Sequence, residues 1–204
     1  MTATGSMDGS TGRRIIVLAR HGQVALSTRR LGGHAAFGEF LATYDRAPLD
    51  PLHQPPPDLA ALAGGATTLF TSSLPRSQAS ATMLVPGFPV RSLPLFDEAP
   101  LPVPPLPLPL PMVAWTIVAR LLWLAGAGGC ESAAAVRDRA AQACTVLENA
   151  AAAGSVFLVG HGWMNHLLAR ALIRRGWRVE EITGHGPWSR RILSAPPNGQ
   201  GAER

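Results

Sequence analysis

The sequence predicts an α/β fold, because two apolar runs each end in a histidine-glycine motif. Residues 15–19 lead into Arg-His-Gly at 20–22, and residues 156–159 lead into Gly-His-Gly at 160–162. Continuous apolar runs of this length are typical of strands buried on both faces of a sheet. Both histidines would therefore lie at the carboxyl end of a strand, the edge of an α/β sheet where ligands bind.

A third short strand is predicted at residues 69–72, followed by Ser-Leu-Pro-Arg at 73–76. Two histidines, His21 and His161, and two arginines, Arg20 and Arg76, would then converge on one sheet edge. Histidine can act as a nucleophile, and arginines stabilise the charge of a transferring phosphoryl group. The pattern favours phosphoryl transfer onto a histidine.

Between the first and second strands, residues 23–57 form a long excursion with a short apolar helix near 37–44. An excursion beside a catalytic strand end suits a lid or a substrate loop, although a plain surface loop is the alternative. A helix is predicted over 58–63. Another begins at Pro75, with Ser73 as its candidate N-cap, and would place Arg76 beside free backbone N–H groups that favour phosphate.

In the second half, a strand over 89–95 would deliver Asp97 and Glu98. Alternating Pro and Leu or Val over 100–111 predict a polyproline II segment, which serves either as a rigid wall of the site or as a ligand for a partner. Two helices are expected before the 156–159 strand, over residues 112–125 and 131–153, and a third after it, over residues 164–175.

Length and composition predict one domain. The chain has 204 residues, 21.5 kDa and 47% hydrophobic residues, enough for one sizeable core. We assign the domain to 13–195, with lid excursions near 23–57 and 97–125, and expect disordered tails at 1–12 and 196–204. The longest apolar stretch, 112–125, is too short to span a bilayer.

The net charge of +5 comes from arginine, since the sequence contains no lysine. That excludes a Walker A loop, a pyridoxal Schiff base and a lysine nucleophile. The positive net charge favours an anionic substrate. Because the arginines are scattered along the chain and not gathered into a run, we expect no nucleic-acid partner. Two cysteines, Cys130 and Cys144, are too few for a zinc ribbon and give no disulfide framework, which makes a reducing cytoplasm the default location.

Four motifs in order resemble the histidine phosphatase superfamily, the phosphoglycerate-mutase-like proteins. They are Ala-Arg-His-Gly-Gln at 19–23, Ser-Ser-Leu-Pro-Arg at 72–76, the acidic pair at 97–98 and Gly-His-Gly at 160–162, and the segment 44–49 is similar to the family's Asp-x-Pro-Leu. The match spans about residues 14–175. The resemblance implies a three-layer sandwich with a mostly parallel central sheet flanked by helices.

The resemblance also implies roles for the residues. His21 would attack phosphorus and become phosphohistidine, Arg20 and Arg76 would clamp the phosphoryl group, and His161 would hold an equatorial oxygen, either protonated or as a hydrogen-bond donor. Glu98 would protonate the leaving oxygen and then activate water, with Asp97 as the other candidate. Gln23 and Gly162 complete the predicted substrate-binding set.

Two departures from the family pattern bear on these roles. Glu98 leads into Ala99 and Pro100 where the family often has a Gly-x-x-Glu-Gly stretch, which leaves the acid open between Glu98 and Asp97. After Arg76 a glutamine is displaced and Ser80 stands for a threonine, a change expected to affect helix packing more than chemistry.

The leading function is hydrolysis of a phosphomonoester of a small metabolite. A phosphoglycerate-mutase-type phosphotransferase and a protein phosphohistidine phosphatase share the same intermediate, and an inactive phosphate-binding or interaction module is the alternative outside enzymes. We expect no metal and no cofactor, because His161 and His166 are five residues apart and no acidic or cysteine cluster accompanies them. A homodimer is compatible with the sequence, stable membrane insertion is not expected, and His34, His53, His166 and His185 are interpreted as structural.

Overall fold

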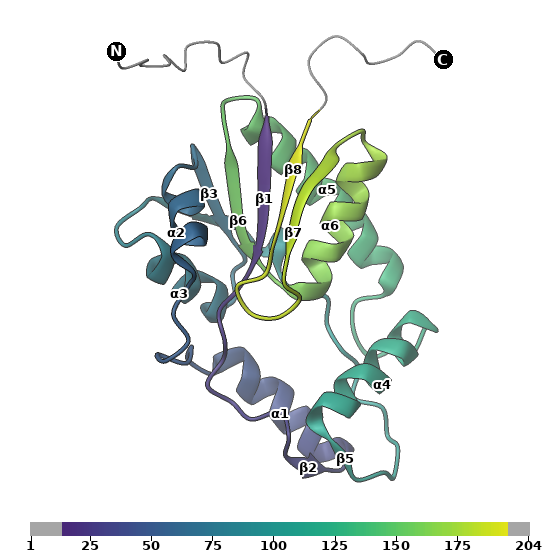
Figure 1. The fold of residues 1–204 in the computed structure, drawn as a ribbon. Helices are drawn as coiled ribbons and strands as arrows, with labels where there is room; N and C mark the ends of the chain where they lie inside the picture. The colour runs from purple at the N-terminus through teal and green to yellow at the C-terminus, as the bar shows by residue number, and fades with distance from the viewer. Residues whose placement is uncertain (1–13, 196–204) are drawn as a thin grey trace, which may run out of the picture.

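A computed structural model describes residues 14–195, so the tails predicted at 1–12 and 196–204 lie outside the described residues. Six strands form one sheet in the order β4, β3, β6, β1, β8, β7 (Figure 1). The strands are β1 (Ile15–Arg20), β3 (Thr68–Thr71), β4 (Val90–Ser92), β6 (Val156–Gly160), β7 (Arg178–Thr183) and β8 (Arg190–Ser194). The first four are parallel to one another. β8 runs antiparallel to its neighbours β1 and β7, so five of the six strands share one direction, which confirms the mostly parallel sheet.

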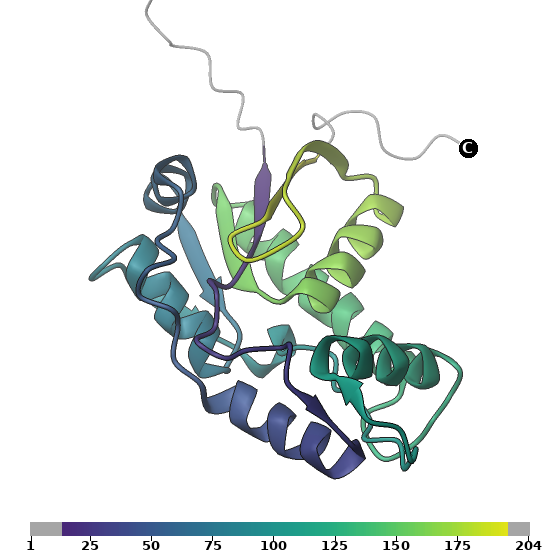
Figure 2. The same cartoon turned by 60° about the horizontal axis from the view of Figure 1, so that its bottom comes forward.

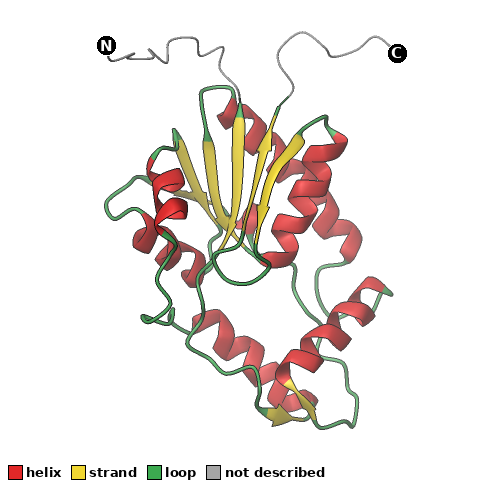
Figure 3. Ribbon diagram, in the orientation of Figure 1, coloured by secondary structure: helices red, strands yellow, loops and turns green. Residues whose placement is uncertain are grey.

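Helices cover both faces of this sheet because its central strands are apolar on both sides. In β1, Ile16 and Leu18 face one core cluster, whereas Val17 and Ala19 face another. The first cluster is covered by α5 (Ala133–Ala151) and α6 (Gly162–Arg174), and the second by α2 (Pro57–Gly64) and α3 (Pro75–Leu84), as Figure 3 shows. This arrangement is the predicted three-layer sandwich.

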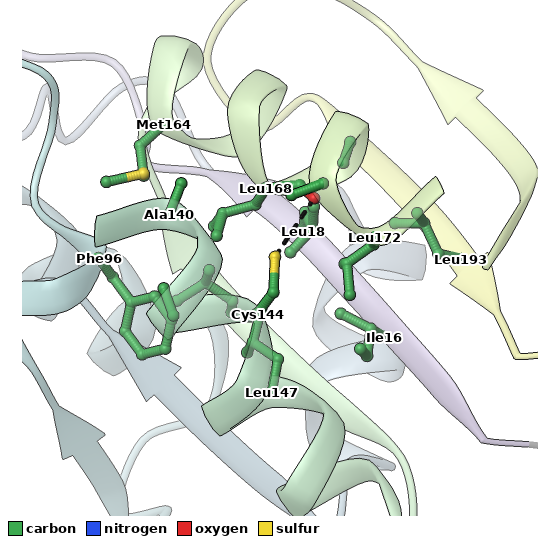
Figure 4. Close-up of a cluster of buried hydrophobic side chains, with 14 of the residues drawn as sticks. Ile16, Leu18, Phe96, Ala140, Cys144, Leu147, Met164, Leu168, Leu172 and Leu193 are labelled. Atoms are coloured by element: carbon green, nitrogen blue, oxygen red, sulfur yellow. Dashed lines mark hydrogen bonds between the residues drawn. The ribbon is translucent and has the colours of Figure 1, made fainter. Parts of the chain in front are cut away.

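The larger core cluster lies between the sheet and α5 and α6 (Figure 4). Cys144 sits in its centre, where its thiol donates to the carbonyl of Leu168 at 3.6 Å. Burial raises the pKa of Cys144 to about 12. Both Cys144 and the half-buried Cys130 are free thiols.

The hairpin of β7 and β8 has no counterpart among the strands that the sequence predicted. Its sequence lacks the apolar run that marks a buried strand, because β7 is an edge strand with mostly exposed side chains. Arg190 of β8 forms an ion pair with Glu181 of β7 and another with Asp58 of α2, which attaches the hairpin to that helix.

Two local predictions were wrong. The strand expected over 89–95 is only Val90–Ser92, and a 3-10 turn, η1 (Pro94–Phe96), follows because Pro94 lacks the N–H that a continuing strand would use. Ser73 is not the N-cap of α3. That position belongs to Leu74, and the Ser73 hydroxyl donates to Asp97 at 2.7 Å instead.

A smaller layer lies beyond the carboxyl ends of the parallel strands (Figures 1 and 2). It consists of α1 (His34–Arg46), α4 (Met112–Leu124) and the short pair β2 (Leu31–Gly32) and β5 (Leu110–Pro111). We call it the lid layer. Its core is the buried cluster of Phe37, Met112, Trp115 and Ala119.

The proline-rich segment 100–111 packs on this lid layer through Leu101, Leu106 and Leu110. The indole of Trp115 donates to the carbonyl of Gly32 at 2.7 Å, which joins α4 to β2. No helix within residues 14–195 is long and apolar enough to cross a bilayer.

Candidate active site

The two histidines meet because β1 and β6 are adjacent parallel strands. Arg20 is in register with Gly160, and the backbone N–H of His21 donates to the Gly160 carbonyl at 3.0 Å. The ring centroids of His21 and His161 are 5.2 Å apart. The structure therefore brings the two histidine motifs together at the carboxyl edge of the sheet.

His21 is buried and held in one tautomer. Its Nδ1 lies 2.8 Å from the carbonyl oxygen of Gly22, and a carbonyl can only accept, so Nδ1 carries the proton and Nε2 keeps its lone pair. Burial and the charge of Arg76 lower the pKa of His21 to about 3. The hydrogen bond to the Gly22 carbonyl raises this pKa, and the charge of Arg20 lowers it. A neutral imidazole with a free Nε2 is the form that a nucleophile requires.

His161 is also fully buried. Its Nε2 lies 2.7 Å from the hydroxyl oxygen of Ser72, while its Nδ1 has no hydrogen-bond partner in the part of the chain that the structure describes. Burial, followed by His21 and Arg76, lowers its pKa well below the usual value. His161 is therefore neutral at neutral pH, and any hydrogen bond it gives to a ligand depends on which nitrogen carries the proton.

Arg76 stands in the first turn of α3, as predicted, with its side chain buried. Its Nη1 donates to Asp45 at 2.8 Å, and its guanidinium lies over the ring of Tyr44, 5.0 Å from the centroid. Tyr44 in turn lies 6.4 Å from the His21 ring. Two residues of the lid helix α1 thus contact the predicted clamp.

Arg20 is held by the loop between β7 and β8. Its Nη1 donates to the His185 carbonyl at 3.2 Å, and its backbone N–H donates to Ser189 at 2.8 Å. A Cβ added to Gly162 would lie 3.5 Å from the Arg20 guanidinium carbon, an ordinary contact distance, so the guanidinium lies beside the start of α6.

Three buried nitrogens of the site have no hydrogen-bond partner among residues 14–195: Nε of Arg20, Nε of Arg76 and Nδ1 of His161. Buried N–H groups without an acceptor are costly, and they are found where a ligand supplies the acceptor. Two guanidiniums and an imidazole around His21 suit an anion with several oxygens, such as a phosphoryl group.

Sequence reasoning missed the part that Ser80 plays. Its hydroxyl accepts the backbone N–H of Gly22 at 2.9 Å and donates to the Arg76 carbonyl at 2.6 Å. Ser80 thus joins the His21-Gly22 turn to the helix that carries Arg76, a contact beyond the helix packing that it was chiefly expected to affect.

Trp188 was also missed. It lies against Gly22 so closely that a Cβ there would be 2.3 Å from Cζ2 of the indole, and its Nε1 donates to the His53 carbonyl at 3.0 Å. Its φ of 60° is a left-handed conformation, rare for a bulky residue. The glycine and proline residues before it were the available signal for a tight loop at this place.

The two acid candidates, Glu98 and Asp97, accept hydrogen bonds from different segments of the site. The Glu98 carboxylate is half-buried and accepts the backbone N–H groups of Trp163 at 3.1 Å and Met164 at 2.9 Å, directly after the His161 motif. The Asp97 carboxylate accepts the backbone N–H and the hydroxyl of Ser73, both at 2.7 Å. Glu98 is thereby attached to the helix that begins at the second histidine, and Asp97 to the segment before Arg76.

The remaining predicted residues lie at the edge of this arrangement. The half-buried Gln23 turns its amide to the carbonyl of Val24 at 2.9 Å. His34 and His53 are exposed, and the ring of His166 lies tilted beside that of Trp163, with the ring centroids 5.5 Å apart. Within residues 14–195 no group of three His, Cys, Asp or Glu side chains gathers as metal ligands do.

Comparison with known proteins relates this arrangement to solved structures. No protein-family model matches the chain. A search of curated proteins also found no match. Among solved structures, one described as mycobacterial hydrolase 1 aligns with a TM-score of 0.61 and 23% identity over 89% of this chain and 91% of that one. The product of an open reading frame of Mycobacterium tuberculosis aligns at 0.57 and 22%, over 88% and 90%.

A mycobacterial glucosyl-3-phosphoglycerate phosphatase aligns with a TM-score of 0.54 and 24% identity, over 79% of this chain and 80% of that chain. The chain therefore has the α/β sandwich fold of phosphoglycerate-mutase-like proteins, the fold of the histidine phosphatase superfamily. The fold expected from the four motifs is confirmed.

Proposed function

We propose that the chain is a histidine phosphatase, which hydrolyses a phosphomonoester of a small metabolite through a phosphohistidine at Nε2 of His21. The observation that carries this proposal is the state of His21. It is buried and neutral, its Nδ1 is hydrogen-bonded to the Gly22 carbonyl, and within residues 14–195 its Nε2 keeps a lone pair without a hydrogen bond, near the charges of Arg76 and Arg20.

In the first step, the Nε2 lone pair of His21 forms a bond to phosphorus while the bond to the leaving oxygen breaks. Arg20 and Arg76 stabilise the charge on the equatorial oxygens. The leaving alkoxide takes its proton from the general acid, for which Glu98 is the leading candidate and Asp97 the other.

In the second step, water attacks phosphorus as the same carboxylate removes its proton. The P–N bond breaks, its electron pair returns to Nε2 of His21, and orthophosphate leaves. The acid of the first step is regenerated, so the cycle closes without a metal ion or cofactor in our proposal.

Two observations support a small phosphorylated substrate. The chain carries a net charge of +5, which favours an anionic ligand. The fold is shared with a mycobacterial glucosyl-3-phosphoglycerate phosphatase and with an Entamoeba histolytica phosphoserine phosphatase solved with 3-phosphoglyceric acid, which aligns at a TM-score of 0.52 and 16% identity.

The test is phosphate release from an aryl phosphate and from a panel of small phosphorylated metabolites, with His21→Ala as the variant. We expect His21→Ala to abolish turnover while its circular dichroism spectrum stays that of the wild type. His53→Ala is the matched control, because it removes an exposed imidazole that makes no side-chain hydrogen bond among the described residues. Wild-type turnover in His21→Ala would overturn the proposal.

Trapping the intermediate gives an independent check. Label from the substrate should remain on the protein in base and be lost in acid, as expected of a phosphoramidate. Base-labile label would place the nucleophile on a carboxylate instead. Transfer of label to a second metabolite without phosphate release would indicate the mutase alternative.

A further inference from the structure

Ser72 and His161 form a buried pair at the centre of the site. Ser72 directly follows Thr71, the last residue of β3, and Thr71 is in register with Val159 of the neighbouring strand β6. Both side chains of the pair are fully buried, and the Ser72 hydroxyl oxygen lies 2.7 Å from Nε2 of His161.

Hydrogen-bond accounting decides the direction of this bond. The Ser72 oxygen already accepts the backbone N–H of Leu74 at 3.2 Å. Among the described residues, Nε2 of His161 is the acceptor within reach of the Ser72 hydroxyl proton. If Nε2 carried a proton instead, that buried hydroxyl would be left as a donor without an acceptor, which is costly. Ser72 therefore donates and Nε2 accepts.

A neutral imidazole that accepts at Nε2 carries its proton on Nδ1. That Nδ1–H is buried and has no partner in the described part of the chain. The centroid of the His161 ring lies 5.2 Å from the centroid of the His21 ring. Because burial and the neighbouring charges lower the pKa of His161 well below its usual value, the neutral ring is the relevant form.

We infer that Ser72 is a positioning residue, which holds His161 as the Nδ1–H tautomer so that this nitrogen donates to an oxygen of the phosphoryl group transferred to His21. The inference deepens the proposed function and rests on it for the phosphoryl group. In the other tautomer, a lone pair at Nδ1 would face an anionic oxygen and repel it. Ser72 thus acts through His161, without contact to the substrate.

The direct measurement is nitrogen NMR of the full chain labelled with ¹⁵N-histidine, with the His161 signals assigned by their loss in His161→Gln. The wild-type protein should show a protonated Nδ1 and an unprotonated Nε2, and addition of inorganic phosphate should shift the Nδ1 proton. A protonated Nε2 in the wild-type protein would overturn the inference.

The kinetic test compares Ser72→Ala with two other variants. Ser72→Ala should lower kcat by about 10²-fold, the usual loss for one donor to a developing charge, with a much smaller change in KM. Ser72→Thr keeps the hydroxyl and should recover most of that loss. Thr71→Val is the matched control, because it removes a neighbouring buried hydroxyl that has no partner among residues 14–195, and it should keep wild-type kinetics.

Unchanged kcat in a folded Ser72→Ala, or retention of the Nδ1–H tautomer in that variant, would overturn the inference. If Ser72→Ala does not fold, the wild-type NMR measurement decides alone. Failure of the proposed function has a different signature: wild-type protein without phosphate release, whose His161 tautomer can still be measured.

Discussion

At the scale of single residues, the site depends on keeping two buried imidazoles neutral. The pKa of His21 is lowered to about 3, chiefly by burial and by Arg76, and burial together with His21 lowers the pKa of His161. A histidine in the unfolded chain titrates near pH 6.5, so below that pH the unfolded chain binds more protons than the folded one. The stabilisation is fully present above about pH 6.5 and is lost as pH falls toward about 3.

The free energy of unfolding should therefore fall on acidification, by up to about 1.4 kcal/mol per pH unit for each histidine. Urea unfolding between pH 7.5 and 4.5 measures this slope. In His21→Gln the free energy of unfolding should depend less steeply on pH, by the equivalent of about one bound proton, since only one of the two buried histidines remains. Parallel curves for the variant and the wild-type protein would contradict the prediction.

Glu98 carries the second prediction at this scale. A general acid, the role that we propose for Glu98, matters most for a poor leaving group, because an alkoxide needs a proton and a nitrophenolate hardly does. Glu98→Gln should slow hydrolysis of an alkyl phosphate by about 10²-fold or more and affect phosphoenzyme formation from an aryl phosphate much less.

Asp97→Asn is the comparison for Glu98→Gln, since each carboxylate accepts hydrogen bonds near one end of the site. Dependence on the leaving group in Asp97→Asn, with none in Glu98→Gln, would assign the acid to Asp97. Equal losses on both substrates in Glu98→Gln would limit Glu98 to positioning the start of α6 or to activating water.

At the scale of elements, the loop between β7 and β8 closes over the nucleophile turn. The Trp188 indole covers Gly22, and the same loop holds Arg20 through the His185 carbonyl. Gly22→Ala should destabilise the fold by about 1–3 kcal/mol, the usual cost of overpacking, and lower kcat by displacing this loop. Thermal unfolding and aryl phosphate turnover measure the two effects.

Trp188→Ala supplies the control through a double-mutant cycle. If the overlap is the cause, Gly22→Ala should cost little stability when Trp188 is already alanine. Additive losses in the double variant would show that Gly22 is required for another reason.

The elements also show what the sequence could predict. Strands β1 and β6 were found because each is an apolar run buried on both faces, and α3 because Pro75 begins it. Strands β7 and β8 were not found, since a polar edge strand has no such signal. For the candidate site, the sequence predicted that the two histidine motifs would meet at one sheet edge, as they do. The contacts of Ser72, Ser80 and Trp188 were not, because they join segments far apart in the chain.

At the scale of the whole molecule, the sheet with its helices and the lid layer each have their own buried side chains, and the two parts meet at the site. The lid layer has its own small core around Phe37 and Trp115, whereas the sheet is packed by two larger clusters. Arg76 links the two parts through its ion pair with Asp45 and its contact with Tyr44. A small core with few buried side chains should open more readily than the sheet.

Native-state hydrogen exchange tests this coupling. Amides of α1 should exchange by about 10-fold or more faster than those of β1 and β6, since local opening costs less than global unfolding. Vanadate, as a phosphoryl analogue bound by Arg76, should slow exchange in α1. In Asp45→Asn the vanadate effect on α1 should shrink while the protection of β1 remains. Equal exchange in α1 and β1 would contradict the two-core interpretation.

The nitrogens of Arg20, Arg76 and His161 that have no partner in the described part of the chain also have a consequence for the last step of the proposed reaction. Orthophosphate has the same kind of oxygens as the phosphoryl group. A site whose donors are already positioned for the phosphoryl group should therefore also bind orthophosphate. In the proposed reaction, orthophosphate should therefore compete with the substrate for the site, and phosphate release should slow as orthophosphate accumulates. Phosphate buffer should inhibit the proposed activity competitively, whereas a buffer without oxyanions should not.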